Sequence, residues 1–150
     1  MRALYTDIEI HASPEAVWAV LTQLSRYDTW NPFITRAEGR VRVGERLTVR
    51  LEPPGGKPMT FRPTVTRVTN HEEFRWLGRL LFRGLFDGEH IFELEALDGH
   101  RVRLIHREEF RGLLVPLLWK RLDTSTREGF EAMNRALKER AEALAGAGGG

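Results

Sequence analysis

The sequence contains no cysteine and only two tyrosines, and it has no long hydrophobic run. Without cysteine, the protein has no disulfide framework, no cysteine-ligated metal centre and no thiol nucleophile. The longest apolar run, Leu113 to Trp119, is seven residues long and contains Pro116. A membrane-spanning helix needs about 20 apolar residues, so we expect no stable membrane insertion.

Residues 1–7 contain no hydrophobic core of signal-peptide length, which predicts a cytoplasmic protein. The chain has 150 residues, of which 41% are hydrophobic and 29% charged. This composition is typical of one folded domain rather than of a disordered chain. We predict a single domain over residues 1–145, followed by a flexible, glycine-rich tail over residues 146–150.

Basic and acidic residues nearly balance, with 23 against 21 and a net charge of +2. Arginine supplies 20 of the 23 basic side chains, and the arginines are interleaved with glutamates. A nucleic-acid-binding domain gathers its basic residues on one face or in one run, so we expect no nucleic-acid partner. Adaptation to heat and a GC-rich genome would both explain the preference for arginine over lysine.

The first third of the chain predicts a strand and two short helices. Residues 4–10 alternate between apolar and polar side chains, as in a half-buried strand. Ser13, Pro14 and Glu15 then supply a helix N-cap, a proline at the first helical position and an acidic first turn. Because Pro32 disfavours helical geometry at the preceding residue, a second short helix is expected to end in an aromatic turn.

The remaining two thirds predict strands followed by one long helix. Pro63 indicates a sheet edge or a bulge. Apolar residues recur at helical spacing along 116–144, although Gly129 interrupts them at a cost of about 1 kcal/mol relative to alanine. Strands followed by a helix, without alternation, favour an α+β fold. The strands are predicted over residues 41–52, 59–68, 73–81, 88–97 and 101–111.

Charge pairing predicts a register for the last hairpin. A three-residue loop at 97–99 suits Gly99 and places glutamates directly opposite arginines. A register displaced by two residues would place Glu89 against Glu109, and the charges therefore disfavour it. The predicted pairs are Glu95 with Arg101, Glu93 with Arg103, Ile91 with Ile105, and Glu89 with Arg107.

The other face of this hairpin is apolar except for three side chains, His90, His106 and Glu108. In the predicted register the two imidazoles lie opposite each other and the carboxylate lies two residues further along. An unpaired buried carboxylate is costly, so Glu108 needs either a partner or water. A water-accessible pocket between sheet and helix would meet that need.

Two loops at one end of the predicted sheet are unusually apolar, namely 81–86 and 112–115. Exposed apolar clusters mark an entrance, an interface or a membrane contact. Gly84 and Gly112 would let these loops move. We interpret this end as the entrance to a pocket.

The sequence resembles the START-like (SRPBCC) superfamily, and in particular its small bacterial polyketide cyclase/dehydrase-like branch. The resemblance implies a helix-grip fold, with a curved seven-stranded antiparallel sheet around a long C-terminal helix and two short helices after the first strand. It also implies an internal apolar cavity. Fold membership does not itself define a reaction. The resemblance is carried by residues 12–18, 27–33, 75–78, 87–94 and 106–112.

The expected cavity suggests a set of ligand-binding residues. Within it, His90, His106 and Glu108 admit three roles: polar groups that orient a ligand, an acid/base pair formed by His106 and Glu108, or a metal-ligand set. The first is favoured, and we expect no metal and no cofactor. The candidate residues are Trp30, Phe33, Trp76, Phe82, Phe86, His90, Phe92, His106, Glu108, Phe110, Leu122, Thr126, Phe130 and Met133.

The favoured function is binding of a small hydrophobic or aromatic ligand between the sheet and the C-terminal helix. The alternative is a polyketide cyclase- or dehydratase-like enzyme that uses His106 and Glu108 as acid and base. A third hypothesis is that the protein is a protein-interaction module of the chaperone-activator type, which would act through Phe82 and Phe86. The sequence leaves a homodimer open.

Overall fold

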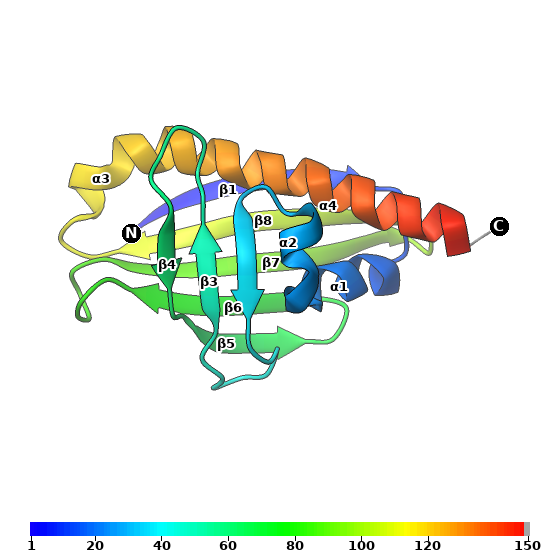
Figure 1. Ribbon diagram of the computed structural model, residues 1–150, viewed down its shortest axis with the longest axis horizontal. Coiled ribbons are helices and arrows are strands. Elements are labelled where there is room, and N and C mark those ends of the chain that lie inside the picture. Colours follow the sequence, from blue (N-terminus) through cyan, green and yellow to red (C-terminus); the bar gives the residue numbers. More distant parts are fainter. Residues whose placement is uncertain (149–150) are drawn as a thin grey trace.

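The chain forms two antiparallel sheets, a group of short helices and a long C-terminal helix (Figure 1). This computed structural model describes residues 1–148. The elements are β1 (Arg2–Ile10), α1 (Pro14–Thr22), η1 (Leu24–Arg26), α2 (Tyr27–Trp30), β2 (Ile34–Glu38), β3 (Thr48–Leu51), β4 (Met59–Phe61), β5 (Thr64–Thr69), β6 (Glu73–Arg79), β7 (Asp87–Asp98), β8 (Arg101–Arg111), α3 (Val115–Arg121), η2 (Leu122–Thr126) and α4 (Arg127–Gly148).

The prediction of seven strands in one sheet is wrong. Five strands form one sheet in the order β1-β8-β7-β6-β5, and β2, β3 and β4 form a second. Pro63 divides the strand predicted over 59–68, because a proline has no N–H to donate within a sheet. Residues before it pair with β3 and residues after it pair with β6. A single bridge between Arg46 and Thr64 links the two sheets.

Strand β2 was missed, and a strand predicted from residue 41 begins only at Thr48. Gly39 and Gly44 have φ angles of +126° and +90°, so the segment between them turns instead of extending. Hydrogen bonds from Gly44 N to Val65 O and from Val65 N to Glu45 O hold this turn against β5. By contrast, β1, β6, β7 and β8 lie within two residues of their predicted bounds.

The long C-terminal helix is present, but it contains a wider turn. Helix α3 begins at Val115, η2 is a π-helical turn, and α4 continues through Gly148. Part of the predicted tail, residues 146–148, is therefore helical, and residues 149–150 lie outside the described part of the chain. Helix α4 crosses the molecule and packs on β1 and α1 (Figure 1).

The predicted hairpin register is wrong by two residues. The turn consists of Gly99 and His100, a bulge follows Ala96, and Glu89 lies opposite Glu109. Arginine side chains are long enough to reach acids diagonally, so direct opposition was not needed. Arg107 contacts Glu93 at 2.6 Å and Glu109 at 3.3 Å. Because a shift of two residues preserves which face each side chain takes, the inward-facing set was still correct.

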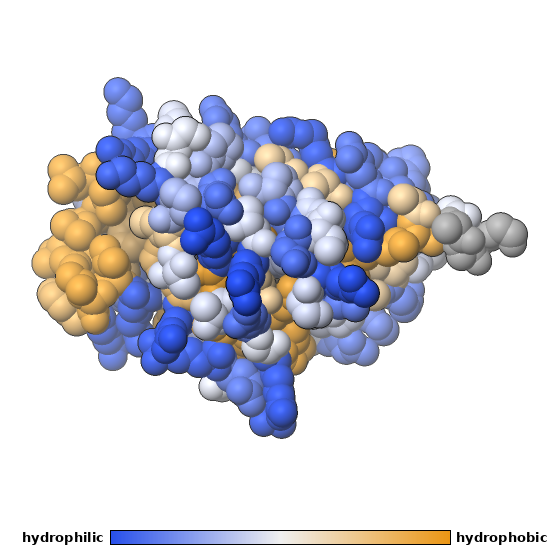
Figure 2. All heavy atoms as spheres, in the orientation of Figure 1, coloured by the Kyte–Doolittle hydropathy of each residue, from blue (hydrophilic) through white to orange (hydrophobic). Residues whose placement is uncertain are grey.

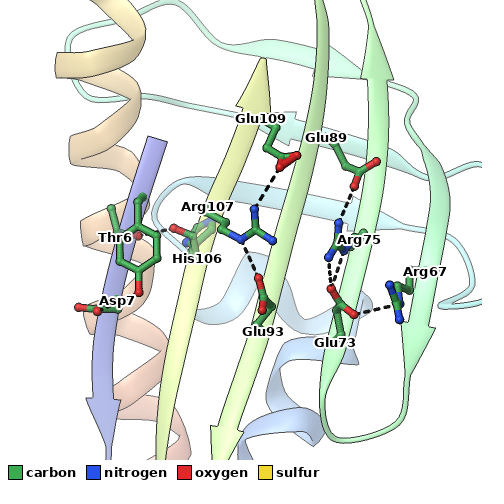
Figure 3. A network of polar contacts seen from close by, with 11 residues as sticks. Thr6, Asp7, Arg67, Glu73, Arg75, Glu89, Glu93, His106, Arg107 and Glu109 are labelled. Atoms are coloured by element: carbon green, nitrogen blue, oxygen red, sulfur yellow. Dashed lines mark hydrogen bonds and ion pairs between the residues drawn. The ribbon is translucent and has the colours of Figure 1, made fainter. Parts of the chain in front are cut away.

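The outer face of the large sheet carries a network of ion pairs (Figure 3). Arg75 lies between two acids, at 2.5 Å from Glu73 and 3.0 Å from Glu89. The side chain of Ile91, on the same face and opposite Arg75, is completely buried. The charged residues of this face therefore also cover apolar surface with their side-chain stems.

Candidate functional site

Three ionisable side chains meet on the inner face of the large sheet, as the sequence predicted. His90 Nε2 lies 2.6 Å from His106 Nε2, and His90 Nδ1 lies 3.4 Å from Glu108 Oε1. His90 lies directly opposite Glu108 in the register, so the contact between the two histidines is diagonal. Both histidines are buried, whereas the Glu108 side chain is 16% exposed. The carboxyl group therefore forms the solvent-facing end of the cluster.

The inner end of the cluster is closed by Asn134 of α4 and Thr6 of β1. Thr6 Oγ1 donates its only proton to His106 O at 2.6 Å, so it must accept a proton from Asn134 Nδ2 at 2.9 Å. This orientation turns Asn134 Oδ1 toward His106 Nδ1, 2.8 Å away. His106 therefore carries its proton on Nδ1.

The direction of the remaining hydrogen bonds follows from that tautomer. A neutral His106 protonated on Nδ1 has a lone pair on Nε2, so His90 must donate from its own Nε2. His90 Nδ1 then presents a lone pair to Glu108 Oε1, 3.4 Å away. A carboxyl group that turns its proton toward this lone pair leaves its second oxygen, Oε2, as an acceptor. His90, His106, Asn134 and Thr6 thus form a one-directional chain of hydrogen bonds that begins beside Glu108.

Burial keeps the carboxyl group of Glu108 protonated at neutral pH. Loss of hydration raises the pKa of Glu108 to about 8 and lowers the pKa of His90 to about 3. The pKa of His106 is also held well below its ordinary value, first by burial and then by the neighbouring His90. At neutral pH the cluster therefore carries no net charge, which is compatible with its burial.

Aromatic rings fill the centre of the predicted cavity. The His106 ring stacks on Phe130 at a centroid distance of 4.0 Å and an angle of 5°, and Phe92 lies 4.6 Å from His106. Phe92, His106 and Phe130 have no accessible surface, so no water-sized space adjoins them. These residues form packed core in the structure, and His106 does not face the open end.

The open end lies around Glu108. Gly88 and Gly78 are directly opposite in the register, on the same inner face as His90, and neither has a side chain. Glu108 Oε2 occupies the position that a Cβ at Gly88 would take, while a Cβ at Gly78 would meet no atom nearer than 3.9 Å. This cross-strand row leaves space beside the carboxyl group.

Aromatic side chains flank this end. Phe110 packs on Phe86 at 5.6 Å and on Trp119 of α3 at 6.3 Å. Phe86, Trp119 and Leu122 are half-buried and contact the core, and Leu122 begins the π-helical turn. π-helical turns are frequent at functional sites because they shift side chains relative to a regular helix.

The structure separates the predicted site residues into three groups. The buried group consists of Phe33, Trp76, His90, Phe92, His106, Phe110, Phe130 and Met133. The partly exposed group consists of Trp30, Phe86, Glu108, Leu122 and Thr126. Phe82 is 61% exposed, in the loop that also carries Phe86. Two surface hollows are lined by none of these residues: one of about 330 Å³ beside Thr6 and Asn134, at the inner end of the cluster, and one of about 340 Å³ on the outer sheet face.

Residues 1–145 match the family described as "Polyketide cyclase / dehydrase and lipid transport". The chain belongs to this family. The match spans nearly the whole chain and confirms the START-like resemblance predicted from the sequence. No curated protein matches the chain. None of the helices formed by residues 1–148 is long and apolar enough to cross a membrane.

Solved structures share the fold of this polyketide cyclase/dehydrase and lipid-transport family member at low identity. The Zhui aromatase/cyclase from Streptomyces sp. R1128 superposes with a TM-score of 0.81 at 16% identity, covering 99% of this chain and 98% of its own. A START superfamily protein from Mycobacterium smegmatis has a TM-score of 0.75 at 19% identity, with coverages of 95% and 98%. Norcoclaurine synthase from Thalictrum flavum has a TM-score of 0.73 at 14% identity, with 95% of each chain covered.

Sequence reasoning missed four residues that shape this family member's site, namely Thr6, Asn134, Gly88 and Trp119. Asn134 had a detectable signal, because it is four positions after Phe130 and is therefore a polar residue on the buried face of the helix. Thr6 had a weaker one, as the polar member of the inward face of β1. Gly88 and Trp119 had none, since their roles depend on contacts between distant segments.

Proposed function

We propose that the protein binds a small hydrophobic or aromatic molecule at the Glu108 end of the space between the large sheet and the C-terminal helix. A partly exposed carboxyl group among half-buried aromatic side chains carries the proposal. Such a site supplies apolar area for affinity and one polar group for orientation. The family description and the aromatase/cyclase neighbour support a ligand of this class.

The hydrogen-bond chain defines which polar group the ligand would present. A protonated Glu108 that turns its proton toward His90 Nδ1, 3.4 Å from Oε1, would leave Oε2 as an acceptor. A ligand hydroxyl, such as that of a phenol, would donate to Oε2, whereas an ether or a carboxylate offers no proton there. The space beside Gly78 would receive the adjoining ring. Phe86 and Trp119, which are half-buried beside Phe110, would form the walls of the site.

Binding of three related probes tests this function. We expect 2-naphthol to bind about tenfold more tightly than 2-methoxynaphthalene or naphthalene, because one additional hydrogen bond is worth about 1.4 kcal/mol. Isothermal titration calorimetry and tryptophan fluorescence would measure the three affinities. Absence of binding by all three probes would overturn the proposal.

Variants of Glu108 test the polarity of the site. Glu108→Gln keeps a donor toward His90 and an acceptor toward the ligand, so the preference for 2-naphthol should persist. Glu108→Leu removes the acceptor and should abolish the preference while retaining weak binding. Gly78→Ala would place a methyl group in the space beside the carboxyl group and should weaken the binding of all three probes. Gly99→Ala, in the exposed turn after β7, is the matched control.

A second candidate function is proton transfer in a cyclisation or dehydration. It is favoured by the raised pKa of Glu108, about 8, which leaves a protonated acid available at neutral pH. Glu108 would touch the substrate, and His90 and His106 would orient it. Glu108→Gln separates the two functions, since binding would survive in the variant and turnover of a poly-β-ketone substrate would not.

A further inference from the structure

Five large apolar side chains project from the end of the molecule formed by α3 and the β6–β7 loop. They make up the orange area at the left of Figure 2, here called the end patch. Exposed apolar side chains that occur singly are ordinary, but a contiguous group marks a contact surface. The end patch consists of Leu80 (39% exposed), Leu81 (85%), Phe82 (61%), Leu113 (81%) and Leu117 (79%).

The two loops that carry the end patch are joined into one unit. Leu113 N donates to Gly84 O, and Leu114 N donates to Leu85 O, both at 3.0 Å. Gly112, with φ +130°, passes so close to Leu85 that a Cβ there would lie 2.5 Å from Leu85 O. The backbone therefore fixes where the apolar side chains point.

Leu81 gives an independent indication of function. Its φ is +63°, in the left-handed region that leucine rarely adopts, yet its side chain is the most exposed of the large apolar ones. Strained backbone at an exposed position is retained most readily where it serves a contact. No burial within the chain accounts for this conformation.

Basic side chains surround the end patch. Arg83 follows Phe82, Arg111 precedes the Leu113 loop, and Lys120 and Arg121 lie one helical turn after Leu117. All four are exposed, and none has an ion-pair partner among residues 1–148. The end patch is therefore apolar at its centre and positively charged at its margin.

A hollow of about 340 Å³ adjoins this margin on the outer sheet face. Its lining includes Arg83 and Arg111, together with Arg79 and three acids. Each acid already has a basic partner: Asp87 pairs with Arg79 at 3.6 Å, Glu89 with Arg75 at 3.0 Å, and Glu109 with Arg107 at 3.3 Å. Three arginines and three acids therefore line the hollow, and Arg83 and Arg111 are the arginines of this lining without an ion-pair partner among residues 1–148.

We infer that the end patch docks the protein reversibly on an anionic phospholipid surface. Leucine and phenylalanine would enter the interface between headgroups and acyl chains, while the marginal arginines and lysine contact lipid phosphates. The charges argue against self-association, because a two-fold dimer through this patch would enclose the basic margins of both copies in one interface. The inference is independent of which ligand occupies the Glu108 site.

Vesicle flotation tests the inference with the full-length protein. Vesicles of phosphatidylcholine containing 30% phosphatidylglycerol should bind the protein roughly tenfold or more tightly than pure phosphatidylcholine vesicles. A double variant, Leu81→Ser with Phe82→Ser, should lose roughly tenfold or more in binding to both. A second double variant, Arg83→Gln with Arg111→Gln, should lose only the preference for phosphatidylglycerol.

Matched variants control for the general loss of apolar surface. Val43→Ser and Leu144→Ser alter residues that are 58% and 50% exposed but lie outside the end patch, and they should bind vesicles like the parent protein. Thermal unfolding would establish that all variants are folded. Absence of vesicle binding by the parent protein would overturn the inference. So would end-patch variants that bind normally, or dimerisation in light scattering that these variants abolish.

Discussion

His90 Nε2 lies 2.6 Å from His106 Nε2, although the two residues are not opposite each other in the sheet. The contact is diagonal between adjacent strands, and it requires that one imidazole donate and the other accept. Asn134 and Thr6 decide which does so, because the single hydroxyl proton of Thr6 is committed to His106 O. A residue pair 128 positions apart in the chain thus sets the protonation of the candidate site.

The first prediction concerns the pH dependence of stability. Folded Glu108 keeps its proton to about pH 8, whereas the unfolded chain releases it above its ordinary value of 4.5. The folded state therefore binds more protons between these values, and stability falls as pH rises toward 8. His90 and His106 act oppositely, because below pH 6.5 only the unfolded chain protonates them.

These opposing effects place the maximum of stability near pH 6.5. The free energy of unfolding should then fall by about 2 kcal/mol between pH 6.5 and pH 8. Glu108→Gln removes the titrating group, so it should flatten that limb and steepen the rise of stability between pH 4.5 and pH 6.5, where Glu108 opposes the two histidines. Urea unfolding at a series of pH values would measure both. If the free energy of unfolding fell equally above pH 6.5 in the parent protein and the variant, Glu108 would not be the group responsible.

The second prediction tests Thr6 with an isosteric substitution. Thr6→Val removes the hydroxyl group and leaves Asn134 Nδ2 and His106 O without their partner. Buried polar groups that lose a hydrogen bond cost about 1–3 kcal/mol, so the free energy of unfolding should fall by that amount. Thr60→Val, at an exposed position of β4, makes the same change in atoms and should have little effect.

The third prediction compares two glycines of α4. A Cβ at Gly129 would collide with the ring of Phe33, whereas one at Gly146 would meet no atom within 4 Å. Gly129→Ala should therefore destabilise the protein by about 1–3 kcal/mol despite the higher helix propensity of alanine. Gly146→Ala should instead stabilise it by up to about 1 kcal/mol. Thermal unfolding would show shifts of opposite sign, and equal shifts would refute the packing role of Gly129.

The fourth prediction concerns the outer face of the sheet. Arg75→Gln leaves Glu73 and Glu89 without their shared cation. The free energy of unfolding should fall by about 1 kcal/mol, because a partly buried network of ion pairs contributes more stability than a single exposed pair. The loss should shrink in 1 M salt. Arg36→Gln is the control, since the Arg36 side chain is 71% exposed and, within residues 1–148, pairs only with Glu38. Equal losses of stability in the two variants would show that the network is no more stabilising than an exposed ion pair.

Local patterns predicted the elements but not their assembly into sheets. Alternation along β1 and β8 and the N-cap at Ser13 depend on neighbours in sequence, and these predictions are confirmed. The single sheet and the hairpin register depended on which segments pair. Pro63 divided one predicted strand, and the reach of Arg107 made a register favourable that direct opposition of charges had disfavoured.

For the candidate site, too, the sequence predicted the local features but not the contacts between distant segments. Two-residue periodicity assigned His90, His106 and Glu108 to the inner face, and that assignment was insensitive to the error in register. Periodicity could not show that Phe130 stacks on His106, or that the rings fill the centre of the expected cavity. Those facts depend on how closely α4 packs on segments distant in sequence, such as Phe33 against Gly129 and Phe130.

The sequence by itself determined the absence of thiol chemistry, the α+β order of the elements and the three polar side chains on an apolar face. It did so because composition and periodicity are local properties of a chain. Only the tertiary structure decided that Glu108 is the exposed end of the cluster and that a one-directional hydrogen-bond chain lies behind it. It also gathered Leu81, Phe82, Leu113 and Leu117 into one patch, because proximity between distant segments arises only on folding.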